Sequence, residues 1–218
     1  MASAQEVGPV PYSSIKSPPA IAVDLPDVPD GSGITLEGTY SFFGGRIGRT
    51  FKGQSVQSRE FYGELFDELV GNPSNPLTLN SDSGASLWIG DPIGSASLAL
   101  SGISQHPSGS NDPIGAGSIS ILFDEPVCQF AFKANIKRPM RPISGNYIRG
   151  PLRVTFYTAE GNVLGEYVLG RDDSTSFGFS QSTGAIPSIS GITVENIDEG
   201  GIAVSDMKYN IECMPFVS

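Results

Sequence analysis

The sequence predicts an all-β protein, in which a two-sheet antiparallel sandwich follows an extended N-terminal arm. Short β-rich runs recur roughly every ten residues and are separated by turn-forming residues. The chain has 27 glycines and 17 prolines among 218 residues, which is typical of a protein with many tight turns. Several runs alternate apolar and polar residues, as half-buried strands of an antiparallel sheet do.

The chain divides into an arm and one domain. Ser17-Pro-Pro-Ala20 and Asp24-Leu-Pro-Asp-Val-Pro-Asp30 predict extended, polyproline-like backbone without a periodic apolar pattern. We interpret residues 1–33 as a Pro/Ser-rich arm or linker. Residues 34–218 are long enough to bury one core and are interpreted as the sandwich domain.

Strands are predicted along most of the domain. In chain order they are 34–40, 48–57, 77–79, 86–89, 97–103, 118–123, 127–136, 152–158, 163–169, 176–179, 189–196 and 202–211. Residues 59–70 form the only helix-like window, but Gly63 weakens it, so a short helix and a strand both stay open. In the last strand the alternation slips by one residue at Ser205-Asp206, which predicts a β-bulge. For Trp88 we favour a core position over an exposed platform for a sugar ring.

Composition narrows the function classes. The formal net charge of -10 argues against nucleic acid or an anionic membrane as a general partner. No apolar run reaches about 18 residues, so no membrane span is predicted. The start of the chain lacks the features of an intact signal peptide, while Ala2-Ser3-Ala4 resembles a cleavage site, so we expect a mature secreted, periplasmic or extracellular protein. Cys128 and Cys213 either form a disulfide or remain two buried thiols.

Catalytic patterns are weak. His106 is the only histidine, which excludes a site built from several histidines of this chain. No Gly-x-Ser-x-Gly elbow is present, and with 23 acidic residues any pair of carboxylates is a weak signal. We interpret Glu195, Asp198 and Glu199 as a solvated acidic turn. These weak catalytic patterns favour a protein that is not an enzyme, but they do not decide the question.

One basic constellation stands out. Six of the 13 basic residues fall between positions 133 and 153, around an aromatic and two prolines. Arginine forks match carboxylates and sulphates, and an aromatic face can stack on a sugar ring. The predicted ligand-binding residues are Lys137, Arg138, Arg141, Tyr147 and Arg149. The alternative is a basic loop that balances acidic neighbours such as Asp172-Asp173.

Several motifs together carry a resemblance over residues 117–211. They are Phe130-Ala-Phe132, Val154-Thr-Phe-Tyr157, Phe177-Gly-Phe179, Ile192-Thr-Val194 and Ile202-Ala-Val-Ser-Asp206. This order resembles jelly-roll sandwiches of the galactose-binding-like and carbohydrate-binding-module type, and bacterial secreted proteins of the PEP-CTERM type. The resemblance implies a jelly roll, a carbohydrate ligand and a structural calcium ion. Its calcium ligands would be Glu37, Asp198 and Asp206, with further oxygens to complete the shell.

Three functions follow as expectations. The first is a secreted, non-catalytic binding domain for carbohydrate, in particular an acidic polysaccharide. The second is a polysaccharide lyase, with Tyr147 or His106 as base and an arginine that neutralises the uronate. The third is a structural or assembly protein that forms a homo-oligomer through its N-terminal arm.

Overall fold

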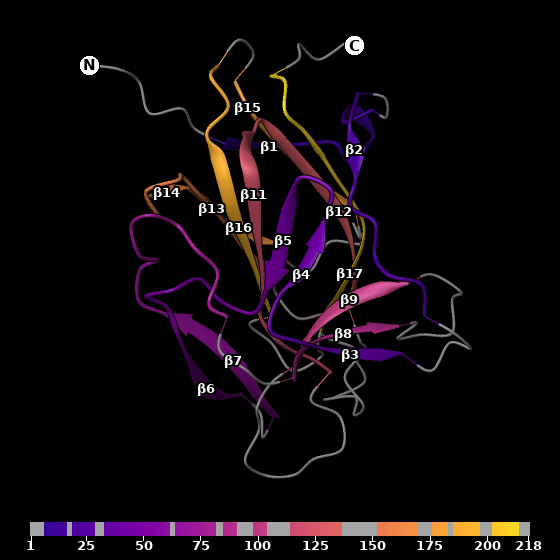
Figure 1. Ribbon diagram of the computed structural model, residues 1–218, viewed down its shortest axis with the longest axis vertical. Helices are drawn as coiled ribbons and strands as arrows, with labels where there is room; N and C mark the ends of the chain where they lie inside the picture. The colour runs from indigo at the N-terminus through magenta and orange to yellow at the C-terminus, as the bar shows by residue number, and fades with distance from the viewer. Residues whose placement is uncertain are drawn as a thin grey trace.

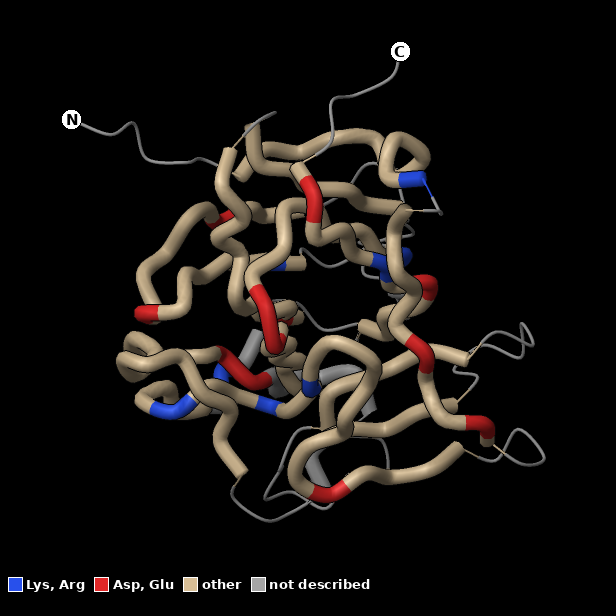
Figure 2. The backbone as a smooth tube through the Cα atoms, turned by 45° about the horizontal axis from the view of Figure 1, so that its top comes forward, with Lys and Arg blue, Asp and Glu red and all other residues tan. Residues whose placement is uncertain are grey.

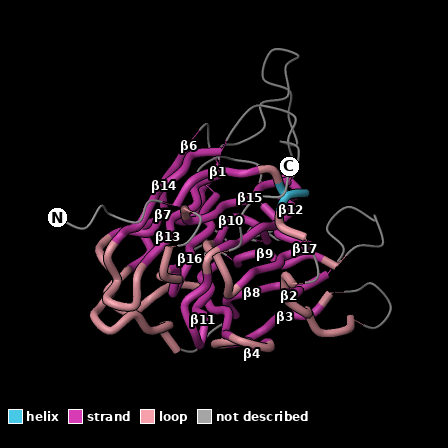
Figure 3. Tube along the Cα trace, turned by 90° about the horizontal axis from the view of Figure 1, so that it is seen from above, coloured by secondary structure: helices cyan, strands magenta, loops and turns pink. Residues whose placement is uncertain are grey.

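A computed structural model shows two packed antiparallel sheets and a separate hairpin (Figure 1). It describes residues 7–16, 19–28, 33–61, 64–81, 85–90, 98–103, 114–136, 152–169, 176–182, 185–196 and 202–213. Within these ranges one 3₁₀ turn, η1 (Tyr12–Ser14), accompanies the strands, and no α-helix occurs (Figure 3). The predicted all-β class and the sandwich-like pairing of antiparallel sheets are confirmed.

The larger sheet has nine strands. Its main path is β1 (Val7–Val10), β15 (Ser176–Gln181), β12 (Gln129–Ile136), β17 (Ile202–Asn210), β9 (Ala99–Ile103), β8 (Ala85–Gly90) and β3 (Ile34–Glu37). Two short strands join it off this path: β2 (Ile21–Ala22) pairs with β17, and β10 (Ile114–Gly117) pairs with β9. Every pair is antiparallel.

The smaller sheet has six strands. Their order is β14 (Val163–Leu169), β13 (Leu152–Tyr157), β16 (Ile189–Asn196), β11 (Ile119–Val127), β5 (Gly45–Gly48) and β4 (Tyr40–Phe42). A separate two-stranded unit consists of β6 (Ser55–Phe61) and β7 (Glu64–Val70). Figure 1 draws this hairpin apart from the strands of the two sheets.

The main core lies between the two sheets and follows from the alternation in the sequence. In β13, Val154 and Phe156 are buried in this core, whereas Arg153 and Thr155 point to the outer face. The facing sheet contributes aromatic side chains such as Phe130 and Phe132 from β12. Rings in contact, with centroids 4.8 to 6.4 Å apart, connect Phe156, Phe179 and Phe132 across the interior. Such packing accounts for most of the favourable free energy of a sandwich this size.

The described parts of the arm, residues 7–16 and 19–28, pack on the domain of its own chain. β1 adds an edge strand to β15, and β2 pairs with β17. Between them, Ile15 and Ala20 pack on Ala131 of β12 in a small apolar cluster. The arm is therefore extended, as the prolines predict, and it belongs to the sheet it crosses.

The segment 49–80 covers the outer face of the six-stranded sheet. Phe51, Leu77 and Leu79 form a second buried cluster with Leu122 of β11 and Tyr157 of β13. Phe51 and Leu79 also form an isolated antiparallel bridge. The smaller sheet is thus buried on both faces over part of its area.

A disulfide joins Cys128 and Cys213, which are 85 residues apart. It attaches the segment just after β17, which ends at Asn210, to the connection between β11 and β12. This resolves the choice between a disulfide and free thiols. In the described ranges, no helix is long and apolar enough to span a membrane.

Two local predictions need correction or completion. The helix-like window 59–70 is the β6–β7 hairpin, with register Ser55↔Val70 to Phe61↔Glu64. The predicted strand 48–57 is broken near Gly53, whose φ of 86° lies in the left-handed region, so the chain turns into β6 there. The jelly-roll connectivity stays a prediction.

Candidate functional site

Most of the predicted site residues lie outside the described ranges, namely Lys137, Arg138, Arg141, Tyr147, Arg149 and Asp198. Two further members of the basic constellation are described on either side of that segment. Lys133 lies in β12, between the core residues Phe132 and Ala134, so its side chain points to the outer face of the nine-stranded sheet. Arg153 lies in β13 and points to the outer face of the six-stranded sheet. These two cations therefore do not share a face.

A polar cluster lies on the outer face of the nine-stranded sheet, where η1 meets β12 and β17. We call its members, Tyr12, Lys133, Asp206 and Lys208, the Tyr12 surface. Tyr12 Oη donates a hydrogen bond to the Asp206 carbonyl oxygen at 3.1 Å. Lys133 Nζ forms an ion pair with Asp206 Oδ2 at 2.6 Å. Lys208 Nζ lies 4.0 Å from the centroid of the Tyr12 ring, within the range of a cation–π interaction.

Asp206 occupies the predicted bulge of β17. Ala131 pairs with Lys208, and Lys133 pairs with Ser205, so Asp206 and Met207 together oppose the one residue Phe132. Asp206 has φ of 47°, the only positive φ of a non-glycine residue in the described ranges. Aspartate tolerates this left-handed conformation better than most residues. The extra residue directs the carboxylate outward toward Lys133, which confirms the phase slip at Ser205-Asp206.

The charges of the Tyr12 surface shift one another's pKa values in both directions. The hydrogen bond from Lys133 to Asp206 raises the pKa of Lys133, and the Asp206 charge adds to this. Burial raises the pKa of Tyr12, so its phenol stays neutral at neutral pH. Burial, with the charge of Lys133 second, lowers the pKa of Lys208. The side chains of Lys133 and Asp206 are 44% and 54% exposed, so both remain open to a ligand.

The predicted calcium ligands do not come together as a group among the described residues. Glu37 is exposed at the end of β3, and β8 and β9 separate that strand from β17, which carries Asp206. Asp206 is instead paired with Lys133. In the described part of the chain, no group of three or more His, Cys, Asp or Glu is placed to hold a metal ion. Calcium binding stays a prediction.

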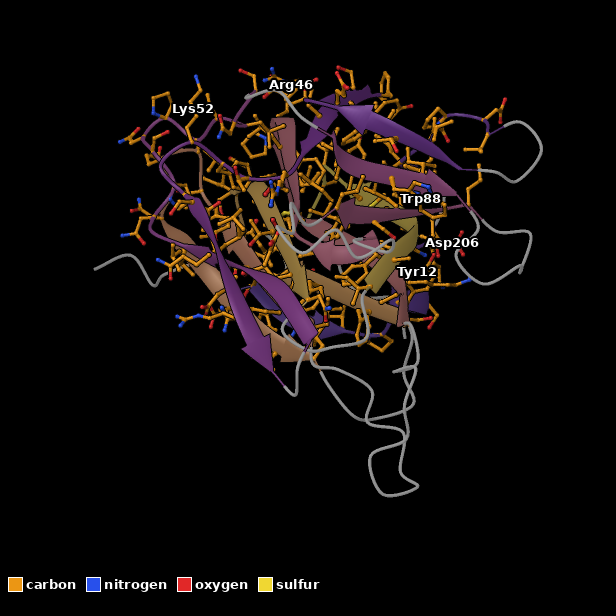
Figure 4. All side chains as sticks on the ribbon, turned by 90° about the horizontal axis from the view of Figure 1, so that it is seen from below. Tyr12, Arg46, Lys52, Trp88 and Asp206 are labelled. Carbon is orange, nitrogen blue, oxygen red and sulfur yellow. A yellow bond between two sulfur atoms is a disulfide. The ribbon has the colours of Figure 1, made fainter. Side chains whose placement is uncertain are left out.

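Trp88 is not a core residue, contrary to the prediction. Its neighbours Leu87 and Ile89 are fully buried, while Trp88 is half-buried on the outer face of β8. The indole packs over Gly33 and Gly90, where a Cβ atom would collide with it. Alternation was the correct signal, but its phase depends on which face of β8 meets the second sheet. In Figure 4 the Trp88, Tyr12 and Asp206 labels lie on one side of the molecule, away from Lys52.

A second polar group lies between the six-stranded sheet and the segment 49–80. We call six of its residues, in the sheet or next to it, the polar seat: Ser118, Ser120, Arg153, Thr155, Thr193 and Glu195. Ser118 and Ser120 both donate hydrogen bonds to the Arg49 carbonyl oxygen, at 2.9 and 3.0 Å. Glu195 is 3% exposed, and its Oε1 accepts a hydrogen bond from the Leu69 backbone N–H at 2.9 Å. The interpretation of Glu195 as part of a solvated turn is therefore wrong, because β7, far away in the sequence, covers it.

Burial dominates the electrostatics of Glu195. It raises the pKa of this carboxyl, while the Leu69 N–H and the charge of Arg153 act in the opposite direction. Arg153 is the cross-strand partner of Glu195, and its buried Nε has no hydrogen-bond partner within the described residues. No local pattern in the sequence marks this group. The only available signal was the basic constellation, which includes Arg153 itself.

Charges are otherwise dispersed. Figure 2 shows acidic and basic positions interspersed over the described fold, without a single basic face.

Comparison of the chain with protein-family models, curated proteins and solved structures gave no match in any of the three. The candidate sites are therefore argued from their own geometry.

Proposed function

We propose that the protein is a secreted, non-catalytic carbohydrate-binding domain that takes an acidic polysaccharide. Its contact surface would combine the Tyr12 surface with the basic segment that holds Lys137, Arg138, Arg141, Tyr147 and Arg149. The supporting observation is the exposed ion pair of Lys133 with Asp206 beside the Tyr12 ring. Lys133 lies on β12, the strand that leads directly into the basic segment.

The chemistry of this surface suits an acidic sugar chain. A carboxylate and an ammonium group side by side offer both an acceptor and donors to sugar hydroxyls. Arginine guanidinium groups bind carboxylates or sulphates through two parallel hydrogen bonds. A glycan that approaches the outer face of the nine-stranded sheet would then meet groups that bind its hydroxyls together with cationic groups that bind its acidic substituents.

The proposal requires that the protein is secreted into an oxidising compartment. Disulfides form and persist in oxidising compartments and are rare in the reducing cytosol of most organisms. The Cys128–Cys213 disulfide and the lack of a membrane-spanning helix in the described ranges are compatible with a secreted or extracellular protein.

Affinity electrophoresis through gels that contain alginate, pectin, carrageenan or a neutral glucan tests the proposal. We expect retardation in an acidic gel, and weaker retardation for the double variant R138A/R141A and for Lys133→Ala. Lys52→Ala is the matched control, because Lys52 is exposed and lies away from the Tyr12 surface (Figure 4). Unchanged retardation of R138A/R141A at an unchanged melting temperature would refute the assignment of the site.

Other outcomes of the same gels point to the alternatives. A cleared track would indicate a lyase, and the clearing should then disappear in Tyr147→Phe. Unchanged mobility in every gel would favour an assembly role, which the mass of the full-length chain in solution tests. Deletion of residues 1–33 is a poor test of assembly, because it would also remove β1 and β2 from the sheet.

A structural calcium ion is the second part of the proposal. Thermal unfolding of the wild type and of Asp206→Asn, with calcium and with a chelator, tests it. Calcium at about 100 times its dissociation constant would stabilise the folded chain by about 2.7 kcal/mol. We expect that gain in the wild type and not in Asp206→Asn. Equal gains in both proteins would remove Asp206 from the set of ligands.

A further inference from the structure

The β6–β7 hairpin has the construction of a movable element. Its seven residue pairs run from Ser55↔Val70 to Phe61↔Glu64, and it pairs with no strand of either sheet in the described ranges. Among its described side chains, Asp67 is the only fully buried one. The described contacts that tie the hairpin to the domain are polar.

Among the described residues, an ion pair and a hydrogen bond tie the hairpin to the rest of the domain. Arg49 Nη2 forms an ion pair with Asp67 Oδ2 at 2.5 Å. The Leu69 N–H donates to Glu195 Oε1 at 2.9 Å. A further ion pair, Arg59 with Glu68, lies within the hairpin and does not tie it to the sheet. Both ties depend on a buried carboxylate.

At the base of the hairpin, one glycine precedes β6 and another follows β7. Gly53 and Gly71 have φ of 86° and 88°, and a Cβ on Gly71 would lie 2.9 Å from the Gly53 carbonyl oxygen. Paired glycines at the ends of an element can absorb the backbone rotation of a hinge. Beyond them the chain is fixed, because Phe51 and Leu77 are buried in the second apolar cluster. The geometry is that of a hinge on a rigid base.

The polar seat has a buried carboxyl group where β7 covers it. Glu195 accepts a hydrogen bond from the Leu69 N–H of β7, so lifting the hairpin breaks this bond and returns the carboxyl group to water. Opening also relieves the burial of the Glu195 carboxylate and of the Arg153 Nε atom, which has no partner within the described residues.

We propose that the β6–β7 hairpin is a flap that lifts from the polar seat about Gly53 and Gly71, with Glu195 as its proton-sensitive latch. Protonation of Glu195 seats the flap, and deprotonation favours opening. This inference is independent of the proposed carbohydrate ligand. It assigns a conformational role to a buried carboxyl that the proposed binding surface does not use.

The direction of the pH effect follows from the groups that face Glu195. In the seated state, burial raises the pKa of Glu195, and the charges of Glu166 and Glu68 raise it further. The Leu69 N–H and Arg153 lower that pKa but do not outweigh burial. In the open state the carboxyl is solvated and returns to its ordinary pKa. The seated state therefore binds the proton more tightly, and a rise in pH shifts the population toward the open state. The Arg49–Asp67 ion pair still resists opening at neutral pH.

Amide hydrogen exchange on the full-length protein tests the flap. Exchange is followed between about pH 5 and pH 8 and expressed as protection factors, which removes the intrinsic pH dependence of exchange. We expect protection at Leu69 and its neighbours in β7 to fall with rising pH, by at most about tenfold per pH unit. Protection in β13 and β16 should stay constant. In Glu195→Gln, which keeps the oxygen acceptor, the pH dependence of β7 should disappear.

Two further variants keep the test decisive. Glu125→Gln removes an exposed carboxylate at the other end of β11 and should retain the wild-type profile. Asp67→Asn removes the other tie, so it should lower the protection of β7 at every pH while the slope persists. The proposal is overturned if β7 protection in the wild type is independent of pH. It is also overturned if Glu195→Gln keeps the wild-type slope, or if Asp67→Asn leaves β7 protection unchanged.

Discussion

Tyr209 in β17 donates a hydrogen bond from its Oη to the carbonyl oxygen of Phe43 at 2.7 Å, and this bond ties the two sheets together. Phe43 lies at the turn between β4 and β5. The next residue, Gly44, has φ of 84°, and a Cβ there would collide with the Tyr209 hydroxyl. The conformation of the turn and the hydrogen bond that connects the sheets therefore depend on each other.

This arrangement predicts different costs for three substitutions. Tyr209→Phe should lower the free energy of unfolding by about 0.5–1.5 kcal/mol, because one hydrogen bond is lost. Gly44→Ala should cost more, since it adds left-handed strain to a collision. Gly38→Ala is the matched control, because Gly38 has φ of 70° but nothing lies within 4 Å of its Cβ. Urea unfolding measures all three, and equal costs at Gly38 and Gly44 would show that the collision is relieved without loss.

The bulge at Asp206 predicts an unusual order of stabilities. Asp206→Ala should lower the free energy of unfolding by about 1 kcal/mol, because alanine adopts the left-handed conformation poorly. Asp206→Gly should stay close to the wild type, since glycine adopts it freely and the exposed ion pair with Lys133 contributes about 0–1 kcal/mol. Thermal unfolding compares the two variants. An alanine variant as stable as the glycine variant would contradict a left-handed Asp206.

The disulfide predicts a large effect on stability. Replacing Cys128 and Cys213 together by serine opens a loop that spans 85 residues. The chain-entropy model gives a loss of about 4–5 kcal/mol for a loop of this length. Reduction of the wild type under native conditions should give a similar loss. Denaturant midpoints of the oxidised and reduced wild type measure it, and coincident midpoints would mean that the bridge contributes nothing.

The second apolar cluster predicts that the segment 49–80 packs firmly on the six-stranded sheet through the residues of this cluster. Leu122→Ala should cost about 2–5 kcal/mol, because Leu122 is 7% exposed beneath that segment. Val168→Ala, on a side chain that is 60% exposed, should change stability by no more than about 0.5 kcal/mol. Urea unfolding of both variants compares them. A negligible effect of Leu122→Ala would show that residues around Phe51 and Leu79 do not pack on the sheet.

Glu195 predicts a pH-dependent contribution to global stability. Its pKa in the folded state is raised above the ordinary value of 4.5. Folding therefore favours the protonated carboxyl, and its stabilising contribution is complete below the ordinary pKa and is lost as the pH rises through the folded pKa. Glu195→Gln should thus gain stability relative to the wild type as the pH rises. Urea midpoints of both proteins from acidic to slightly alkaline pH test this, and a constant difference would contradict it.

Sequence reasoning succeeded where local periodicity decides the structure. The predicted strand 189–196 has the same bounds as β16, and the hairpin of β13 and β14 lies where the alternation places it. Even the irregularity at Ser205-Asp206 was visible, because a bulge shifts the phase of the side chains by one residue. For the two cysteines the sequence left a disulfide and two buried thiols open, and the structure shows the disulfide.

Sequence reasoning failed where a distant segment changes the environment of a residue. Residues 59–70 have mixed propensities, and only pairing across the β6–β7 turn makes them strands. Glu195 looked like part of an acidic turn, but β7 covers it. The predicted binding residues from Lys137 to Arg149 lie outside the described ranges, so their assignment is still a sequence-based prediction.

The sequence by itself determined the all-β class, most strand positions, the bulge and the acidic overall charge, because each depends on neighbouring residues along the chain. Only the tertiary structure decided that the arm packs on its own domain, that Trp88 faces outward and that Glu195 is buried. Those features depend on which surfaces meet in space. The free energy of burial and of polar pairing is set by partners such as Leu69 and Lys133, which no local pattern identifies.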